Sequence, residues 1–132
     1  MRHALPLLLA GIALAAAPAH ALKRASPEAQ LAKALEGRVA GEPVDCLNLS
    51  DIRSSRIIDR TAILYEASGG KLYVNRPEGG AQTLHRSDVM VNKVWGGRLC
   101  NVDVVDLYDA GARVPTGFVH LGKFVPYTKP KN

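Results

Sequence analysis

A cluster of arginines and serines is the most promising place in this sequence for binding chemistry. The cluster consists of Arg53, Ser54, Ser55, Arg56 and Arg60. Guanidinium groups bind phosphate or carboxylate through paired N–H donors, so these arginines, with Asp59 as a polar partner, are candidate ligand-binding residues. The simpler interpretation is a solvated segment in which Asp51 and Asp59 neutralise the arginines. The charge pattern favours it, because exposed charge runs usually contribute little.

Two histidines offer a different chemistry. His85 and His120 are the only histidines beyond the first 21 residues. One could act as base and the other as acid in cleavage of RNA, with Lys93 or Lys123 stabilising the charged transition state. Nothing in the sequence brings them together, so this metal-independent hydrolase is an alternative to a non-enzymatic function.

Three aspartates recur at every third position, at Asp103, Asp106 and Asp109. On a strand, the first and last would point to one side and the middle one to the other. The segment lacks the spacing and the glycine of a calcium-binding loop. Motifs of serine hydrolases, P-loops, dinucleotide sites and zinc proteases are absent, so we expect no catalytic motif, no metal and no cofactor.

The N-terminal residues predict export from the cytoplasm. Arg2 and His3 precede an apolar run over Ala4–Ala17, and small residues flank His20. This pattern is typical of a signal peptide over residues 1–21, cut after Ala21. The run is shorter than the roughly 20 apolar residues of a membrane span, although an uncleaved anchor is the alternative. We therefore expect a periplasmic or secreted protein with no membrane span after cleavage.

The chain has two cysteines, Cys46 and Cys100. In an oxidising compartment an even pair predicts one disulfide, and a bridge over so long a loop would stabilise the fold by about 4 kcal/mol. The alternatives are a catalytic thiol and a two-thiol metal site. Neither cysteine has an obvious base nearby, and no Cys-x-x-Cys motif is present.

Residues 22–45 are predicted to form a leader that contains one short helix. Ser26 is a favourable N-cap, and Pro27 would occupy the first helical position, where its missing N–H costs nothing. Leu31 and Leu35 are four residues apart and share a face of the predicted helix.

The rest of the chain predicts an α+β fold that is mainly β. Five segments have the composition of strands: 57–66, 71–76, 89–95, 98–107 and 117–125. Ser68–Gly70 indicates a hairpin between the first two segments. A two-residue turn at Gly96–Gly97 would join the next two and place Lys93 opposite Cys100. We expect a small antiparallel curled sheet or partly closed barrel of about five strands, with the helix on one side.

Composition limits the number of domains and the classes of partner that we expect. The 132-residue chain is 47% hydrophobic and 22% charged, which suits a single globular domain over residues 46–128 with a short tail at 129–132. The formal charge of +5 includes Arg2, which the predicted cleavage removes. The remaining charges are few and scattered, so we expect no specific nucleic-acid partner and a monomer.

Seven aromatic residues remain after the predicted cleavage: Tyr65, Tyr73, Trp95, Tyr108, Phe118, Phe124 and Tyr127. Some could line a ligand pocket in a curled sheet. Packing in the core or across strands is the interpretation that the strand pattern favours.

From Cys46 to about Thr128 the chain resembles a family of small exported proteobacterial proteins of unknown function. The resembling blocks are Cys46-Leu47, Ser54 to Asp59, Thr61 to Tyr65, Tyr73-Val74-Asn75, Leu99-Cys100 and Leu121 to Tyr127. The resemblance implies a compact exported domain and no established activity. It supplies no catalytic residue, and His85 and His120 lie outside the blocks.

Members of this family often carry two further cysteines, which would fall near Ala81 and Val119. Both are absent here. Their joint absence is what the loss of one disulfide would produce, and it leaves Cys46 paired with Cys100.

The sequence thus predicts an exported, non-enzymatic small module that binds a ligand or an envelope protein. Its predicted binding residues are Arg53, Arg56, Asp59 and Arg60. The alternatives are the hydrolase that uses His85 and His120, and a structural protein of the cell envelope.

Overall fold

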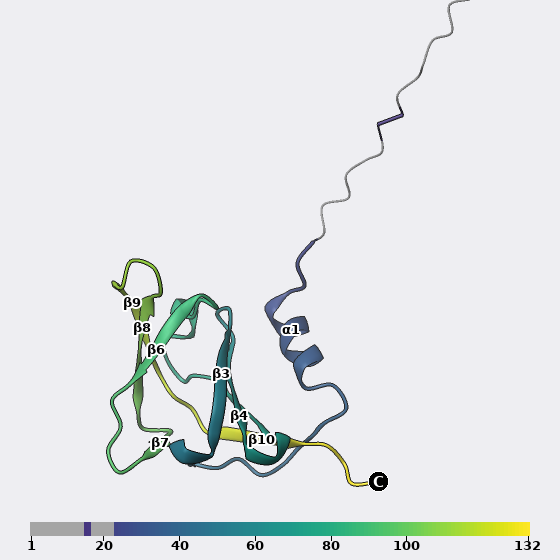
Figure 1. Cartoon of the computed structure of the whole chain (residues 1–132), viewed down its shortest axis with the longest axis vertical. Coiled ribbons are helices and arrows are strands. Elements are labelled where there is room, and N and C mark those ends of the chain that lie inside the picture. The colour runs from purple at the N-terminus through teal and green to yellow at the C-terminus, as the bar shows by residue number, and fades with distance from the viewer. Residues whose placement is uncertain (1–14, 17–22) are drawn as a thin grey trace, which may run out of the picture.

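The computed structural model describes residues 15–16 and 23–132, and these contain one α-helix and ten strands (Figure 1). The helix is α1 (Pro27–Ala34), and the strands are β1 (Val39–Ala40), β2 (Cys46–Asn48), β3 (Ile52–Ile58), β4 (Ala62–Ala67), β5 (Leu72–Asn75), β6 (Asp88–Asn92), β7 (Arg98–Cys100), β8 (Val104–Asp109), β9 (Pro115–His120) and β10 (Phe124–Thr128). The single short helix and the predominance of strands confirm the predicted fold class.

The predicted signal peptide, with its cleavage site after Ala21, lies almost wholly outside the described residues. Among the residues that are described, no helix is long and apolar enough to cross a membrane.

The strands form three antiparallel sheets that do not close into a barrel. The largest has the order β1-β10-β5-β4-β3, the second the order β6-β8-β9, and the smallest pairs β2 with β7. The predicted turn at Ser68–Gly70 is present, and it joins β4 and β5 as an antiparallel hairpin. We expected one curled sheet, but the strands form three sheets. The chain changes direction at more places than its glycines indicate.

The helix packs on one face of the five-stranded sheet (Figure 1). The Ser26 hydroxyl accepts a hydrogen bond from the Ala29 N–H at 3.2 Å, and Pro27 occupies the first turn, as predicted. A small core lies between helix and sheet: Leu31, Ile58, Ala62, Leu64 and Val74. The leader therefore packs on the β domain.

The opposite face of this sheet carries the main core. Its buried residues come from all three sheets and from the connections: Leu47, Ile57, Ile63, Tyr65, Leu84, Leu99, Val105, Leu107, Val119, Leu121 and Phe124. The rings of Tyr65 and Phe124 meet edge-on, with centroids 5.7 Å apart. Burial raises the pKa of the Tyr65 hydroxyl. The fold is thus a helix, a five-stranded sheet and a smaller sheet in layers.

Three of the predicted strands are each divided by a short connection. The segment 57–66 contains the end of β3, a reversal at residues 59–61, and most of β4. Arg60 adopts a φ of 52°, in the left-handed region that usually belongs to glycine. The segments 98–107 and 117–125 are interrupted in the same way, between β7 and β8 and between β9 and β10. None of these interruptions has a glycine pair to mark it.

The predicted hairpin at Gly96–Gly97 is wrong. β6 pairs with β8, and β7 pairs with β2, so Cys100 lies opposite Cys46. Lys93 instead forms an ion pair with Asp106 at 3.4 Å. The register of β7 is set by burial, because Leu99 pairs with Leu47 and both enter the main core.

The predicted disulfide between Cys46 and Cys100 is present. It joins directly paired residues of β2 and β7. The Asp103 carboxylate accepts a hydrogen bond from the Cys100 N–H at 2.6 Å, and this closes the turn that leads to β8. The bridge therefore fixes the point from which both larger sheets depart.

A buried asparagine ties the connection between β9 and β10 to β5. The Asn75 side chain is fully buried, donates to the Gly122 carbonyl at 2.7 Å and accepts from the Gly122 N–H at 3.0 Å. A Cβ at Gly122 would lie 2.4 Å from the Arg76 carbonyl oxygen, so only glycine fits. Two blocks of the family resemblance thus contact each other at this point.

Removal of the disulfide tests how much the β2–β7 junction contributes. We expect Cys46→Ala/Cys100→Ala to lower the free energy of unfolding by about 2–5 kcal/mol, because the unfolded chain regains the entropy of a long loop. Urea unfolding of the oxidised protein and the variant measures the difference. Equal unfolding midpoints and slopes would contradict the assigned role.

The resembling family often has two further cysteines, and the disulfide that they would form can be tested at Ala81 and Val119. The Glu78 N–H donates to the His120 carbonyl at 3.0 Å, and the His120 N–H to the Gly79 carbonyl at 2.9 Å, so this connection lies along β9. We expect Ala81→Cys/Val119→Cys to form a second disulfide and to gain about 2–4 kcal/mol when oxidised. Denaturing mass and urea unfolding with and without reductant measure this. Two free thiols in the oxidised, folded variant would refute the pairing.

Candidate functional site

The helix leaves part of the five-stranded sheet uncovered, and a hollow of about 320 Å³ lies there. The hollow is lined by Arg38, Ser54, Ser55, Arg56, Leu64, Glu66 and Leu72. We call it the helix-side hollow. Strand alternation explains its composition, since Arg56 pairs with Leu64, and Leu64 with Val74 of the core under the helix.

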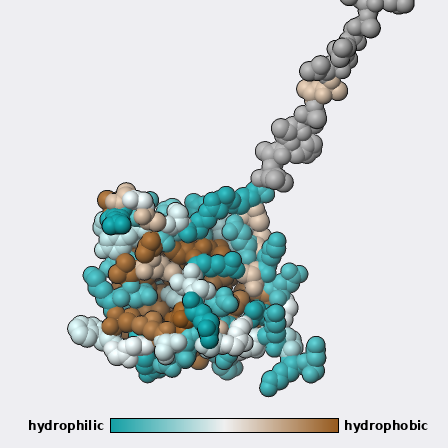
Figure 2. All heavy atoms as spheres, in the orientation of Figure 1, coloured by the Kyte–Doolittle hydropathy of each residue, from teal (hydrophilic) through white to brown (hydrophobic). Residues whose placement is uncertain are grey.

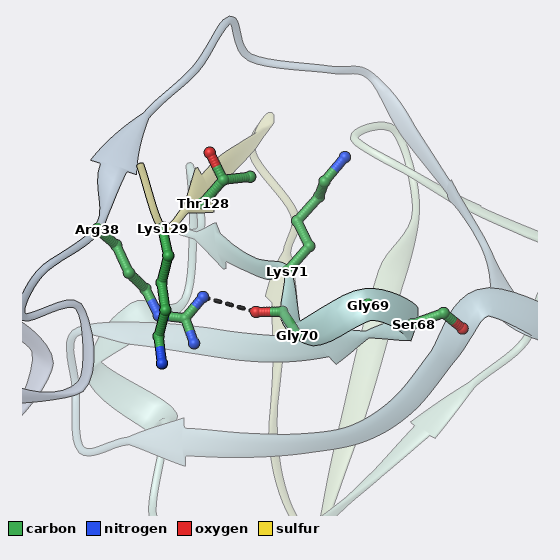
Figure 3. Close-up of a pocket in the computed structure, with 7 residues that line it drawn as sticks. All are labelled: Arg38, Ser68, Gly69, Gly70, Lys71, Thr128 and Lys129. Carbon is green, nitrogen blue, oxygen red and sulfur yellow. Dashed lines mark hydrogen bonds between the residues drawn. The ribbon is translucent and has the colours of Figure 1, made fainter. Parts of the chain in front are cut away.

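Arg38 is held in place beside this hollow by the main chain. Its Nη1 donates to the Gly70 carbonyl at 2.6 Å and lies 3.5 Å from the Tyr127 carbonyl oxygen (Figure 3). Both bonds use the same nitrogen, so the other guanidinium nitrogens retain their capacity to donate. Arg38 therefore reaches the hollow as a partly immobilised cation.

The remaining lining residues combine charge with an aliphatic floor. Arg56 is exposed on β3 and lines the hollow together with Arg38, which comes from the connection after α1. The Ser54 hydroxyl donates to the Glu66 carboxylate at 3.3 Å. Leu64 is buried and Leu72 is half-buried, so Leu72 supplies most of the apolar surface among the lining residues. Guanidiniums above an apolar floor suit a small ligand with an anionic group.

A second hollow of about 440 Å³ adjoins the first, and Arg38 lines both. Its lining is Arg38, Ser68, Gly69, Gly70, Lys71, Thr128 and Lys129, drawn in Figure 3. We call it the turn-side hollow, because the turn between β4 and β5 forms part of its lining. Its charged lining residues are all cationic.

Only one of the four predicted binding residues lines these hollows. Arg56 lines the helix-side hollow, whereas Arg53 and Arg60 are exposed and line neither hollow. Asp59 has a structural role, because its carboxylate accepts a hydrogen bond from the Arg86 N–H at 2.6 Å. Ligand binding by these four residues stays a prediction. The sequence gives no sign that Arg38, 18 residues before Arg56, lines the same hollow as Arg56.

The two histidines do not line a common hollow in the structure. His120 is exposed at the end of β9, where its ring meets Phe118 edge-on at 5.7 Å, and it lines an open hollow of about 510 Å³ with Glu78. His85 does not line that hollow. Within residues 23–132 no hydrogen bond or ion pair joins them. The lysines considered with them pair elsewhere, Lys93 with Asp106 and Lys123 with Asp45.

Each of the three spaced aspartates makes a separate contact. Asp103 bonds the Cys100 N–H, Asp106 pairs with Lys93, and Asp109 accepts from the N–H groups of residues 111 and 112. Over the described part of the chain, no group of three or more His, Cys, Asp or Glu side chains could hold a metal ion.

The outer face of the β6-β8-β9 sheet carries several exposed apolar side chains, together with Asp106 and His120. It carries Val89, Val91, Val104 and Phe118, which is 53% exposed, and Figure 2 shows hydrophobic residues gathered over the region of β6. Trp95 is 94% exposed in the connection that follows β6. Packing explains Tyr65 and Phe124 among the aromatics, but not Trp95 or Phe118.

Comparisons with models of known protein families, with curated proteins and with solved structures find no match to this chain. The resemblance to small exported proteobacterial proteins therefore stays a prediction.

The different roles of Asp59 and Arg56 predict different effects on stability. We expect Asp59→Ala to lower the free energy of unfolding by about 1–3 kcal/mol, because it removes the acceptor of the Arg86 N–H. Arg56→Ala should change it by less than about 0.5 kcal/mol, as for other surface substitutions. Urea unfolding of both variants measures this. A larger loss of stability for Arg56→Ala than for Asp59→Ala would show that Arg56 is the structural residue.

Proposed function

We propose that this protein is an exported, non-enzymatic binding module that holds the anionic group of a small ligand in the helix-side hollow. The observation that carries the proposal is the placement of Arg38 and Arg56, from separate elements, around one hollow above Leu64 and Leu72. Two guanidiniums at one apolar depression are suited to recognition of a carboxylate or phosphate with an attached apolar group.

The export part of the proposal rests on two features. The N-terminal pattern predicts a signal peptide cut after Ala21, which would deliver the protein to the periplasm or the medium. The Cys46–Cys100 disulfide supports this, since disulfides form and persist in oxidising compartments. In this account the exported protein acts as a monomer and uses no cofactor.

Benzoate and benzamide form a matched pair of probes, because they share a ring and differ in charge. We expect benzoate to bind the oxidised protein and benzamide to bind much more weakly, in titrations followed by heteronuclear NMR. Arg56→Gln should weaken benzoate binding about tenfold, the effect of losing one charge-assisted hydrogen bond. Glu66→Gln should strengthen it a few-fold, because a repelling carboxylate at the rim is removed.

Arg53→Gln is the matched control. It removes the same charge from the same strand, at an exposed position outside the hollow. Equal effects of the two arginine substitutions, or equal binding of benzoate and benzamide, would contradict the proposal.

A further inference from the structure

We infer that the natural ligand carries at least two phosphate groups and spans both hollows, with Arg38 between them. This inference rests on the proposed function and extends it to the neighbouring turn-side hollow. Arg38 is the residue that the two hollows share, so a ligand anchored there can reach into both.

The charges around the two hollows favour a multiply charged anion. Four cationic side chains line them, Arg38, Arg56, Lys71 and Lys129, against one carboxylate, that of Glu66. A phosphate monoester carries about −1.5 to −2 charges near neutral pH. One such group does not balance this excess of positive charge, whereas two do.

These cations are not neutralised by acidic neighbours in the structure. The three ion pairs among residues 23–132 are Arg76–Glu28, Lys93–Asp106 and Lys123–Asp45. Each involves a cation outside the two hollows. Arg56, Lys71 and Lys129 thus have no ion-pair partner within the described part of the chain.

The cations are also spread out rather than gathered around one point. They come from four segments: the connection after α1, strand β3, the residue just before β5 and the residue just after β10. Figure 3 shows that Lys71 extends away from Arg38 and Lys129 at the turn. Separated cations suit separated anionic groups, because a single phosphate contacts only the side chains within hydrogen-bond distance of it.

Neutral donors complete the turn-side hollow. Thr128, whose hydroxyl can donate a hydrogen bond, lines this hollow with Lys71 and Lys129. The main chain there is open because Gly69 and Gly70 have no side chains. Both glycines have positive φ, of 77° and 73°, so a larger residue would be strained as well as obstructive. The turn thus leaves its backbone accessible to a ligand.

Tripolyphosphate and inorganic phosphate test the inference by isothermal titration calorimetry on the oxidised protein. We expect tripolyphosphate to bind at least about tenfold more tightly than phosphate, because it can contact both hollows. Lys71→Gln/Lys129→Gln should remove most of that advantage and leave benzoate binding unchanged. Lys93→Gln/Lys123→Gln is the control, since it removes the same charge from exposed positions elsewhere.

Two results of the calorimetry would overturn the inference. If both double variants weaken tripolyphosphate equally, the effect is one of net charge and not of a site. If Arg56→Gln weakens tripolyphosphate but Lys71→Gln/Lys129→Gln does not, the ligand is confined to the helix-side hollow, and the proposed function survives without its extension. If the wild-type protein does not bind benzoate, by contrast, the proposed function itself is refuted.

The phosphate groups could belong to a lipid or to a soluble molecule, and vesicles distinguish these sources. Co-sedimentation with phosphatidylcholine vesicles containing cardiolipin, which has two phosphates, would identify a lipid headgroup if Lys71→Gln/Lys129→Gln reduces it. Tripolyphosphate binding without co-sedimentation would identify a soluble ligand. Binding of neither would overturn the inference.

Discussion

The Cys46–Cys100 disulfide is the constraint on which the arrangement of the sheets depends. It crosses the shortest sheet, in which β2 and β7 pair over only three residues. The chain runs from β2 through a short 3₁₀ turn into the five-stranded sheet, and from β7 through the Asp103 turn into the three-stranded one. A three-residue ladder is too short to be stable alone. The covalent bond and the burial of Leu47 and Leu99 therefore hold both sheets at one corner of the core.

Once the main core occupies one face of the five-stranded sheet, the other face needs cover, and α1 is too short to provide all of it. Eight helical residues span about 12 Å, whereas the six residues of β4 span about 20 Å. Leu31 covers the part that contains Ile58, Ala62 and Val74. The part beyond the helix holds Arg56 and Leu72, and there Arg38 folds back onto the Gly70 carbonyl. The helix-side hollow is thus a consequence of a helix that ends early.

Local chemistry made several elements predictable from the sequence. Ser26 and Pro27 define the start of α1, and the glycines at 69 and 70 define the β4–β5 turn. The even pair of cysteines predicts the disulfide. Non-local pairing was not predictable in the same way. The Gly96–Gly97 pair looked like a hairpin turn, but β7 is drawn to β2 by the buried pair of Leu47 and Leu99. Arg38 likewise joins Arg56 only because α1 packs on the sheet, and no spacing in the sequence encodes that.

The most direct test of the central claim is a map of where a polyanion contacts the oxidised protein. Amide chemical-shift changes during a tripolyphosphate titration provide it. The account predicts that the first and largest changes fall on Arg38, on residues 54–56 and on residues 69–71, with little change on β6, β8 and β9. Changes centred on the three-stranded sheet, or spread evenly over exposed lysines, would contradict it.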